Sequence, residues 1–288
     1  MTRKTICFIL CIAFALAFTA VLAGCGEDKS KSRSQNYEKP SGDYVGVLEG
    51  VYRDEFTLMG SSGELHFVTD EETKYDFGEH HRMLVGDIIS VKCRDDESMM
   101  VKKVTVLERT NAQANLGDFA AGLCWPYGES SKGRYDTGGP TEAYAALYDK
   151  IKPQEESGIS SKQWRAGASC DLFVATALKG FGLTEFPVTL SRQCDYFFIS
   201  EAYKDDFEKV ETGGDPAMMQ HGDVGIYIRA DSKDNGQGHI FIVNKADGQN
   251  LKSNAHYRKD KGYYGVIDEL KNPYDPGHYK YFGVFRLK

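Results

Sequence analysis

The hydrophobic positions of residues 43–110 form short runs of β-branched and aromatic side chains, and clusters of turn-forming residues separate these runs. Runs of this length and composition predict β-strands. Five short strands in fewer than 70 residues predict a small closed β-barrel, because closure removes the unpaired edges of a sheet. The predicted strands are Tyr44–Leu48, Phe56–Met59, Leu65–Val68, Ile88–Cys93 and Val101–Leu107.

The pattern changes after residues 111–118, which we interpret as a junction between two domains. Apolar residues then recur at helical spacing in Pro140–Ile151 and in Ser169–Phe181, and Gly182 marks the end of the second helix. Four apolar runs nearer the C-terminus predict strands, and helices followed by antiparallel strands predict an α+β domain over residues 119–288. These strands are Val224–Ile228, His239–Val243, Tyr263–Ile267 and Tyr281–Phe285.

The first 24 residues have the pattern of a secretory leader. Arg3 and Lys4 precede an apolar run from Ile6 to Leu22, and small residues lead up to Cys25. A cysteine at this place predicts lipoprotein processing, in which its thiol receives a lipid before the leader is cleaved. The alternative is a transmembrane anchor, but the run is at the lower limit of the about 17–25 residues that span a bilayer. We therefore expect an exported protein, held at the cell membrane by a lipid on Cys25 and facing outside the cytoplasm.

Residues 25–42 are polar, so we expect them to form a flexible tether between the lipid and the folded body. Because Arg3 and Lys4 leave with the leader, the mature chain has 33 basic against 42 acidic side chains, a net charge near −9. This acidic balance, without a stripe of Lys and Arg, argues against a nucleic-acid partner and against electrostatic docking on anionic lipid. A small or neutral substrate is favoured instead.

The cysteines and histidines of the body do not indicate a metal site. His80 and His81 are adjacent, so their side chains point apart on a strand, and we interpret them as a solvated pair. We expect no metal and no other cofactor. Outside the cytoplasm the cysteines could pair in disulfides, or one of them could be a reactive thiol beside three structural ones. The four cysteines that remain in the mature body are Cys93, Cys124, Cys170 and Cys194.

The segment around Cys170 is the best candidate for chemistry. Ser169 can cap a helix, and Cys170 then falls in the first turn of an amphipathic helix. The unpaired N–H groups of a helix start stabilise an anion, so a thiol there ionises more easily, and a thiolate is the nucleophile that acyl transfer requires. His239 opens a later apolar strand, where its ring could face a cleft and act as a general base. The structural alternatives are a buried filler cysteine and a partly exposed histidine at a strand end.

Together these segments resemble the NlpC-type cell-wall peptidases, a papain-like family of cysteine peptidases. The helix is similar to the family's nucleophile helix, and a Gly-Asp strand and a Gly-His strand follow in the family's order. The resemblance implies a papain-like fold for residues 119–288, with Cys170 as the nucleophile and His239 as the base. The matching residues are Cys170, Phe173, Val174, Ala177, Leu178, Gly182, Leu183, Gly222, Asp223, Gly238 and His239.

The same resemblance implies further site residues. Asn254 falls where the family has the third catalytic group, which orients the imidazole, and His256 competes with it for this position. Trp125 and Tyr127 belong to a segment that looks like the aromatic segment beside the family's cleft, although Tyr127 could be a core residue instead. With Ser169, these two aromatic residues are the expected substrate-binding residues.

The function implied by the resemblance is that of a lipid-anchored hydrolase, which cleaves an amide bond in peptidoglycan stem peptides by Cys-His catalysis. The family usually has Asp before the cysteine and a small residue after it, whereas this chain has Ser169 and Asp171. The alternatives are therefore a catalytically silent binding or adaptor lipoprotein on the same scaffold, and a related Cys-His amidase.

Overall fold

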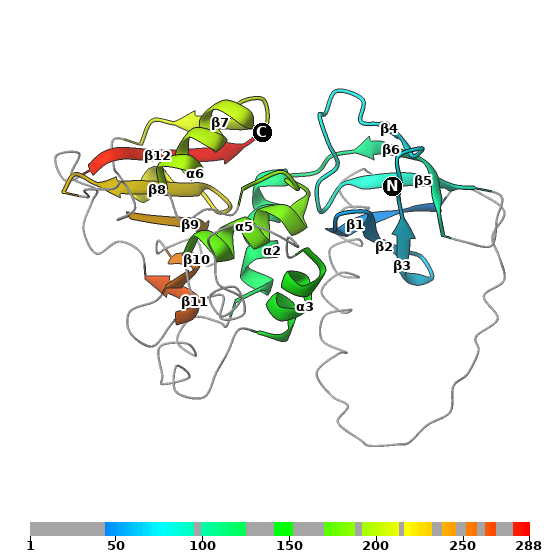
Figure 1. Cartoon of the computed structure of the whole chain (residues 1–288), viewed down its shortest axis with the longest axis horizontal. Coiled ribbons are helices and arrows are strands. Elements are labelled where there is room, and N and C mark those ends of the chain that lie inside the picture. Colours follow the sequence, from blue (N-terminus) through cyan, green and yellow to red (C-terminus); the bar gives the residue numbers. More distant parts are fainter. Residues whose placement is uncertain are drawn as a thin grey trace, which may run out of the picture. The chain divides into compact units, whose positions relative to one another are not determined.

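The chain divides by its internal contacts into two units, Met1–Pro40 and Ser41–Lys288, and every described element belongs to the second unit. This unit combines helices with two sheets (Figure 1), which confirms the expected α+β class. Within the described residues, no helix is both long enough and apolar enough to cross a membrane. The predicted leader, the lipid site Cys25 and the tether lie outside these residues. The computed structural model describes residues 44–94, 99–124, 141–151, 170–187, 192–212, 216–231, 238–245, 252–257, 263–268 and 279–288.

The first sheet contains all five predicted strands and one further short strand. The order is β3-β2-β1-β5-β6-β4, in which β4 and β6 are parallel and the other neighbours are antiparallel. The inward residues of this sheet, among them Leu48, Phe56 and Phe67, form a core cluster of their own. The strands are β1 Tyr44–Val51, β2 Glu55–Gly60, β3 Gly63–Val68, β4 Lys74–Asp76, β5 Ile88–Cys93 and β6 Val101–Glu108.

The expectation that this sheet closes into a barrel is wrong. β3 and β4 are its two edges, and no ladder joins them in the described part of the chain. The outer side of β6, where a five-stranded barrel would close, pairs instead with β4. In the described part of the chain, the end of β3 reaches this region through an isolated bridge between Val68 and Met100.

The second sheet contains the four predicted strands, each starting and ending close to its expected position, together with β7 and β10. Its order is β11-β10-β9-β8-β12-β7, and all neighbours are antiparallel. The strands are β7 Phe207–Val210, β8 Val224–Arg229, β9 Gly238–Asn244, β10 Lys252–Tyr257, β11 Tyr263–Asp268 and β12 Tyr279–Leu287.

Both predicted helices are present, and a third helix fills the expected junction. This helix, α2, begins after Asn111, whose side chain accepts a hydrogen bond of 3.1 Å from the N–H of Ala114. α2, α3 and α5 share one large hydrophobic core with a face of the second sheet (Figure 1). The helices are α2 Ala112–Gly122, α3 Glu142–Ile151, α5 Cys170–Phe181 and α6 Arg192–Phe197, with a π-helical turn at Phe198–Ala202 and a 3₁₀ turn at Pro216–Met218.

A turn before β5 connects the first sheet to the end of α5. Asp87 in this turn is buried, and one carboxylate oxygen accepts the N–H of Leu84 at 2.7 Å. Both oxygens of Asp87 also accept hydrogen bonds from the guanidinium of Arg109, at 2.9 and 2.8 Å. The N–H of Val85 donates to the carbonyl of Phe181, the last residue of α5, at 2.9 Å. The first sheet therefore supplies a donor to the C-terminal end of α5, whose carbonyls have no partner within the helix.

Candidate active site

Cys170 is the first residue of α5, at the helix start that the sequence predicts. Its side chain is 7% exposed and belongs to the large core cluster. Eleven of the twelve residues of α5 are buried, because the helix contacts β9 and β10 as well as α2 and α3. The candidate nucleophile thus lies at the N-terminal end of a buried helix, beside first-turn N–H groups that have no acceptor within the helix.

The middle of α5 is held by α3. The hydroxyl oxygen of Tyr144 lies 3.3 Å from that of Thr176, and the ring of Tyr144 stacks on Phe173 with a centroid distance of 5.8 Å. Gly180 allows this close approach, because a Cβ at that position would come within 2.6 Å of the side chain of Leu147. These contacts set the position of α5, and hence of its first residue.

His239 is the second residue of β9, and its side chain is 4% exposed. β9 pairs with β8 in a regular register that places His239 opposite Tyr227. The imidazole packs against the rings of Tyr227 and Phe241, with centroid distances of 5.9 and 5.5 Å. His239 is therefore held by aromatic contacts on one face of the second sheet.

The two faces of β9 belong to different clusters. Ile240 and Ile242 pack in the large core with Cys170 and the rest of α5, whereas Phe241 belongs to a separate, smaller cluster. Successive side chains of a strand point to opposite faces, so His239 is on the side of Phe241. The structure thus brings α5 and β9 together, but places His239 on the face of β9 turned away from α5.

The candidates for the third catalytic position lie on β10, next to β9. Asn254 pairs with Ile242, and His256 follows two residues later on the same strand. The structure describes only the backbone of β10, so the choice between Asn254 and His256 stays a prediction. The other predicted site residues lie outside the described residues; they are Trp125, Tyr127 and Ser169.

Packing against neighbouring backbone requires the glycines of both the Gly-Asp pair and the Gly-His pair. A Cβ on Gly238 would overlap with the backbone oxygen of Tyr227 on the neighbouring strand. Gly222 has a φ of +86°, which favours glycine, and a Cβ there would overlap with the backbone oxygen of Gln113 in α2. These glycines are therefore needed for the sheet and its contact with α2, whatever the chemistry nearby.

Asp223, the acid of the Gly-Asp pair, is completely buried. Its carboxylate accepts two hydrogen bonds from the guanidinium of Arg286 on β12, each of 2.9 Å, and these raise the pKa of Arg286. It also accepts the N–H of Gln220 at 2.7 Å and the side-chain amide of Gln113 at 3.2 Å. Asp223 thus connects β8, β12 and α2.

His221 is a further histidine near α2, and no motif in the sequence indicates a role for it. Its Nδ1 accepts the N–H of Lys245 at 3.1 Å, so in the neutral ring the proton is on Nε2, which lies 3.0 Å from a carboxylate oxygen of Asp118. Gly117 makes room for the ring, because a Cβ there would overlap with it. Both ring nitrogens therefore serve the packing of α2 against the second sheet.

The described side chains around this site do not include a metal centre. No group of three or more His, Cys, Asp or Glu residues in the described part of the chain is placed to hold a metal ion. What the arrangement offers chemically is the thiol of Cys170 beside helix N–H groups, which are suited to a developing oxyanion.

No protein-family model matches the chain, and a search of curated proteins gave no match. Two structures of CusF are similar to a part of it. A Cu(II) form from Escherichia coli is 14% identical with a TM-score of 0.19, covering 23% of this chain and 90% of that one. An Ag(I) form is 15% identical with a TM-score of 0.18, covering 22% of this chain and 93% of that one. TM-scores this low establish neither a shared fold nor a shared ligand.

Proposed function

We propose that this chain is a lipid-anchored cysteine hydrolase of the cell envelope, which cleaves an amide bond in the stem peptides of peptidoglycan. The observation that carries the proposal is the position of Cys170 at the first residue of the packed helix α5. α5 contacts β9, the strand that begins with Gly238 and His239, and β8 with its preceding Gly-Asp pair is the neighbour of β9. This succession of elements supports the resemblance to NlpC-type peptidases and a papain-like arrangement of residues 119–288.

In this proposal the thiolate of Cys170 attacks the carbonyl carbon of the amide. The N–H groups at the start of α5 stabilise the oxyanion of the tetrahedral intermediate. The resemblance assigns to His239 the transfer of the thiol proton to the leaving amine as the carbon–nitrogen bond breaks, with Asn254 or His256 orienting the ring. The register of β9 puts this imidazole on the face turned away from α5, so the step requires His239 to reach the side of Cys170. Water then hydrolyses the thioester, which releases the carboxylic acid and restores the thiol.

The expected lipid on Cys25 would keep the enzyme at the membrane surface, next to the cell wall. The acidic mature chain, near −9 from 33 basic and 42 acidic side chains, suits a substrate that is not a polyanion. In this proposal the lipid anchor brings the enzyme to the cell wall, and the negative charge of the chain is compatible with the stem peptides as substrate.

Digestion of purified peptidoglycan by the mature lipoprotein tests the proposal. The wild type should release fragments with new amino groups, identified by mass, and Cys170→Ala should release none. Cys194→Ala is the matched control, because Cys194 is an exposed cysteine on α6, in the same sheet-and-helix part of the chain. Fragment release by the Cys170→Ala variant would contradict the assignment of the nucleophile.

The face occupied by His239 favours a second candidate function. An imidazole packed between Tyr227 and Phe241, on the face of β9 turned away from α5, is placed for packing and not for accepting the proton of Cys170. A chain with this arrangement would bind wall material without cleaving it. The second candidate is therefore a binding or adaptor lipoprotein.

His239→Gln distinguishes the two functions. In a hydrolase this variant should lose fragment release while still sedimenting with peptidoglycan. In a binding protein the wild type should already sediment with peptidoglycan without releasing any fragment. His221→Gln is a useful companion variant, because His221 serves the contact with α2 and has no role in the proposed chemistry.

A further inference from the structure

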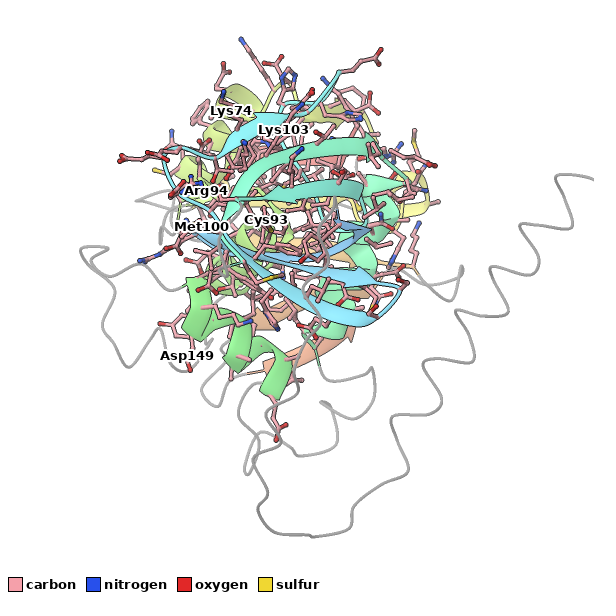
Figure 2. The ribbon with its side chains drawn as sticks, turned by 90° about the vertical axis from the view of Figure 1, so that its right-hand side faces the viewer. Lys74, Cys93, Arg94, Met100, Lys103 and Asp149 are labelled. Atoms are coloured by element: carbon pink, nitrogen blue, oxygen red, sulfur yellow. The ribbon has the colours of Figure 1, made fainter. Side chains whose placement is uncertain are left out.

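Three lysines from three different strands lie in one row across the first sheet. In the register of β5, β6 and β4, Lys92 pairs with Lys103 and Lys103 pairs with Lys74. All three are exposed, whereas Val91 and Val104 in the next row are buried in the core. Figure 2 shows Lys74 and Lys103 next to each other on this surface. We call these three residues the lysine row.

The lysine row is unfavourable for the sheet itself. Like charges directly opposite each other on neighbouring strands destabilise the pairing. Asp76 relieves part of this repulsion, because its carboxylate accepts a hydrogen bond of 2.9 Å from Lys103. Among the described side chains, Lys74 and Lys92 have no acidic partner. The row therefore presents positive charge to solvent.

The usual structural reason for exposed lysines in a sheet explains only one of the three. A lysine on an edge strand hinders pairing with other molecules, and Lys74 lies on the edge strand β4. Lys92 and Lys103 lie on β5 and β6, which have neighbours on both sides. Protection of an edge therefore does not account for the charge on these two strands, which remains available to an anionic partner.

We propose that the lysine row docks on anionic phospholipid headgroups of the membrane to which the chain is anchored. This inference rests on the lipid at Cys25 that belongs to the proposed function. The phosphates of such a membrane are complementary to the row, and basic residues near an anionic leaflet each add to the binding. Docking would turn this face of the first sheet toward the membrane.

The short connection to the lipid favours the membrane over a distant polyanion. Eighteen residues separate Cys25 from Tyr44, the first residue of β1, and β1 pairs with β5, which carries Lys92. A flexible chain of that length spans about 25 Å on average and about 60 Å at full extension. The lysine row thus meets the headgroups at an effective concentration on the order of millimolar, so that weak contacts suffice.

The acidic balance argues against electrostatic docking of the chain as a whole, but not against docking of one basic face. Salt limits electrostatic interactions to about 8–10 Å, so only charges close to the membrane count. The sequence shows no basic run, because the members of the row come from three separate strands and meet only through the register.

Lysine acetylation of the mature lipoprotein in vesicles tests the docking. The protein is reconstituted in vesicles of phosphatidylcholine alone or of phosphatidylcholine with phosphatidylglycerol, treated briefly with an acetylating reagent, and analysed by mass. Lys74, Lys92 and Lys103 should react about tenfold more slowly on the anionic vesicles, and about 0.5 M salt should remove the difference. The exposed Lys204 should react at the same rate on both vesicles.

A triple variant, Lys74→Gln with Lys92→Gln and Lys103→Gln, supplies the second arm. Lys102 is exposed beside the row and serves as the reporter; its protection on anionic vesicles should disappear in the triple variant and persist in Lys204→Gln. If Lys102 is still protected on anionic vesicles in the triple variant, the proposal is overturned.

Other outcomes would also overturn it. Protection by soluble polyphosphate but not by anionic vesicles would assign the row to a soluble polyanion. Equally slow acetylation on both vesicles would show that the protein itself, and not the membrane, shields the lysine row. If the protein does not float with phosphatidylcholine vesicles, the lipid anchor is refuted together with the docking. If it floats but its lysines are acetylated equally on both kinds of vesicle, only the docking is refuted.

Discussion

Asp87 and Asp223 hold equivalent positions in turns that lead into the two different sheets. Each follows a glycine with positive φ, Gly86 at +92° and Gly222 at +86°, and each accepts the N–H of the residue three positions earlier at 2.7 Å. Each carboxylate also accepts two hydrogen bonds from a single arginine side chain. The same local solution therefore anchors one strand in each sheet, β5 and β8.

Replacing Arg286 by glutamine should lower the free energy of unfolding by about 3–5 kcal/mol, because the completely buried Asp223 would lose its cation. Urea unfolding of the purified protein measures this loss. Arg229→Gln is the control, since it disrupts the exposed ion pair with Asp231 and should cost about 0–1 kcal/mol. Equal losses in the two variants would contradict the structural role assigned to Asp223.

Alanine at the positive-φ glycines should destabilise the protein in a fixed order. Gly63→Ala should cost only about 1–3 kcal/mol for its positive-φ backbone conformation, because no atom lies within 4 Å of its Cβ position. Gly86→Ala should cost more, since its Cβ meets the flexible side chain of Asn115. Gly222→Ala should cost most, because its Cβ meets the backbone of Gln113. Thermal unfolding of the three variants measures the order, and a Gly222→Ala protein as stable as Gly63→Ala would refute the close contact with α2.

The pKa of Asp70 is lowered, chiefly by the hydrogen bonds that Arg94 donates to its carboxylate at 2.6 and 2.8 Å. The folded pKa is thus below the unfolded value of about 3.9, so the stability from this pair is present above that value and is lost as the pH falls through the folded pKa. Arg94→Gln should raise the pKa of Asp70 and weaken the dependence of stability on pH below about pH 4.

NMR titration of the carboxyl carbons checks the pKa change, and unfolding between about pH 2 and 5 checks the stability. Lys103→Gln is the matched control, because Lys103 lowers the pKa of Asp76 through its own hydrogen bond. This control should move the titration of Asp76 and leave that of Asp70 in place. If the pKa of Asp70 changed in both variants, the effect would not be specific to Arg94.

Alkylation by iodoacetamide should show whether Cys170 is activated. If the start of α5 and an imidazole favour the thiolate, the labelling rate of Cys170 should rise with an inflection well below pH 8.5, the ordinary value for a thiol. Cys194 is exposed and provides the reference labelling rate in the same molecule. Labelling of Cys170 that rises only at about pH 8.5 would favour the binding lipoprotein over the hydrolase.

The parts of the fold with strong local patterns could be predicted from the sequence. α5 begins at Cys170, at the predicted helix start, because an apolar face and a glycine at the C-terminal end define this helix. The strand at Val224 was predicted from its unbroken apolar run, which is buried on both faces. In contrast, all three residues of β4 are exposed, so no alternation of apolar and polar residues indicates it.

α2 was missed as a helix for a different reason. It contains Gly117 and Gly122 and has only a weak apolar face, so it resembles a linker in the sequence. Gly117 is nevertheless required there, because the ring of His221 occupies the space of a side chain. Only tertiary contacts could show this.

The candidate site was predictable only as a set of residues. Cys170 and His239 were recognised from their places at a helix start and a strand start, but the face on which His239 lies depends on the pairing of β9 with β8. A shift of that register by one residue would move His239 to the other face. The sequence does not contain this register in any local form, and the same is true of the lysine row.

The hydrogen bond from Val85 to Phe181 has a consequence for how this protein can be divided. A chain cut back to residues 119–288 would lose the donor at the end of α5 and would uncover the part of the large core that Leu84 now covers. The first sheet is therefore not an exchangeable attachment. Any recombination that replaced it would have to bring the same turn, with a glycine, a buried acid and an arginine, to keep the helix of Cys170 in place.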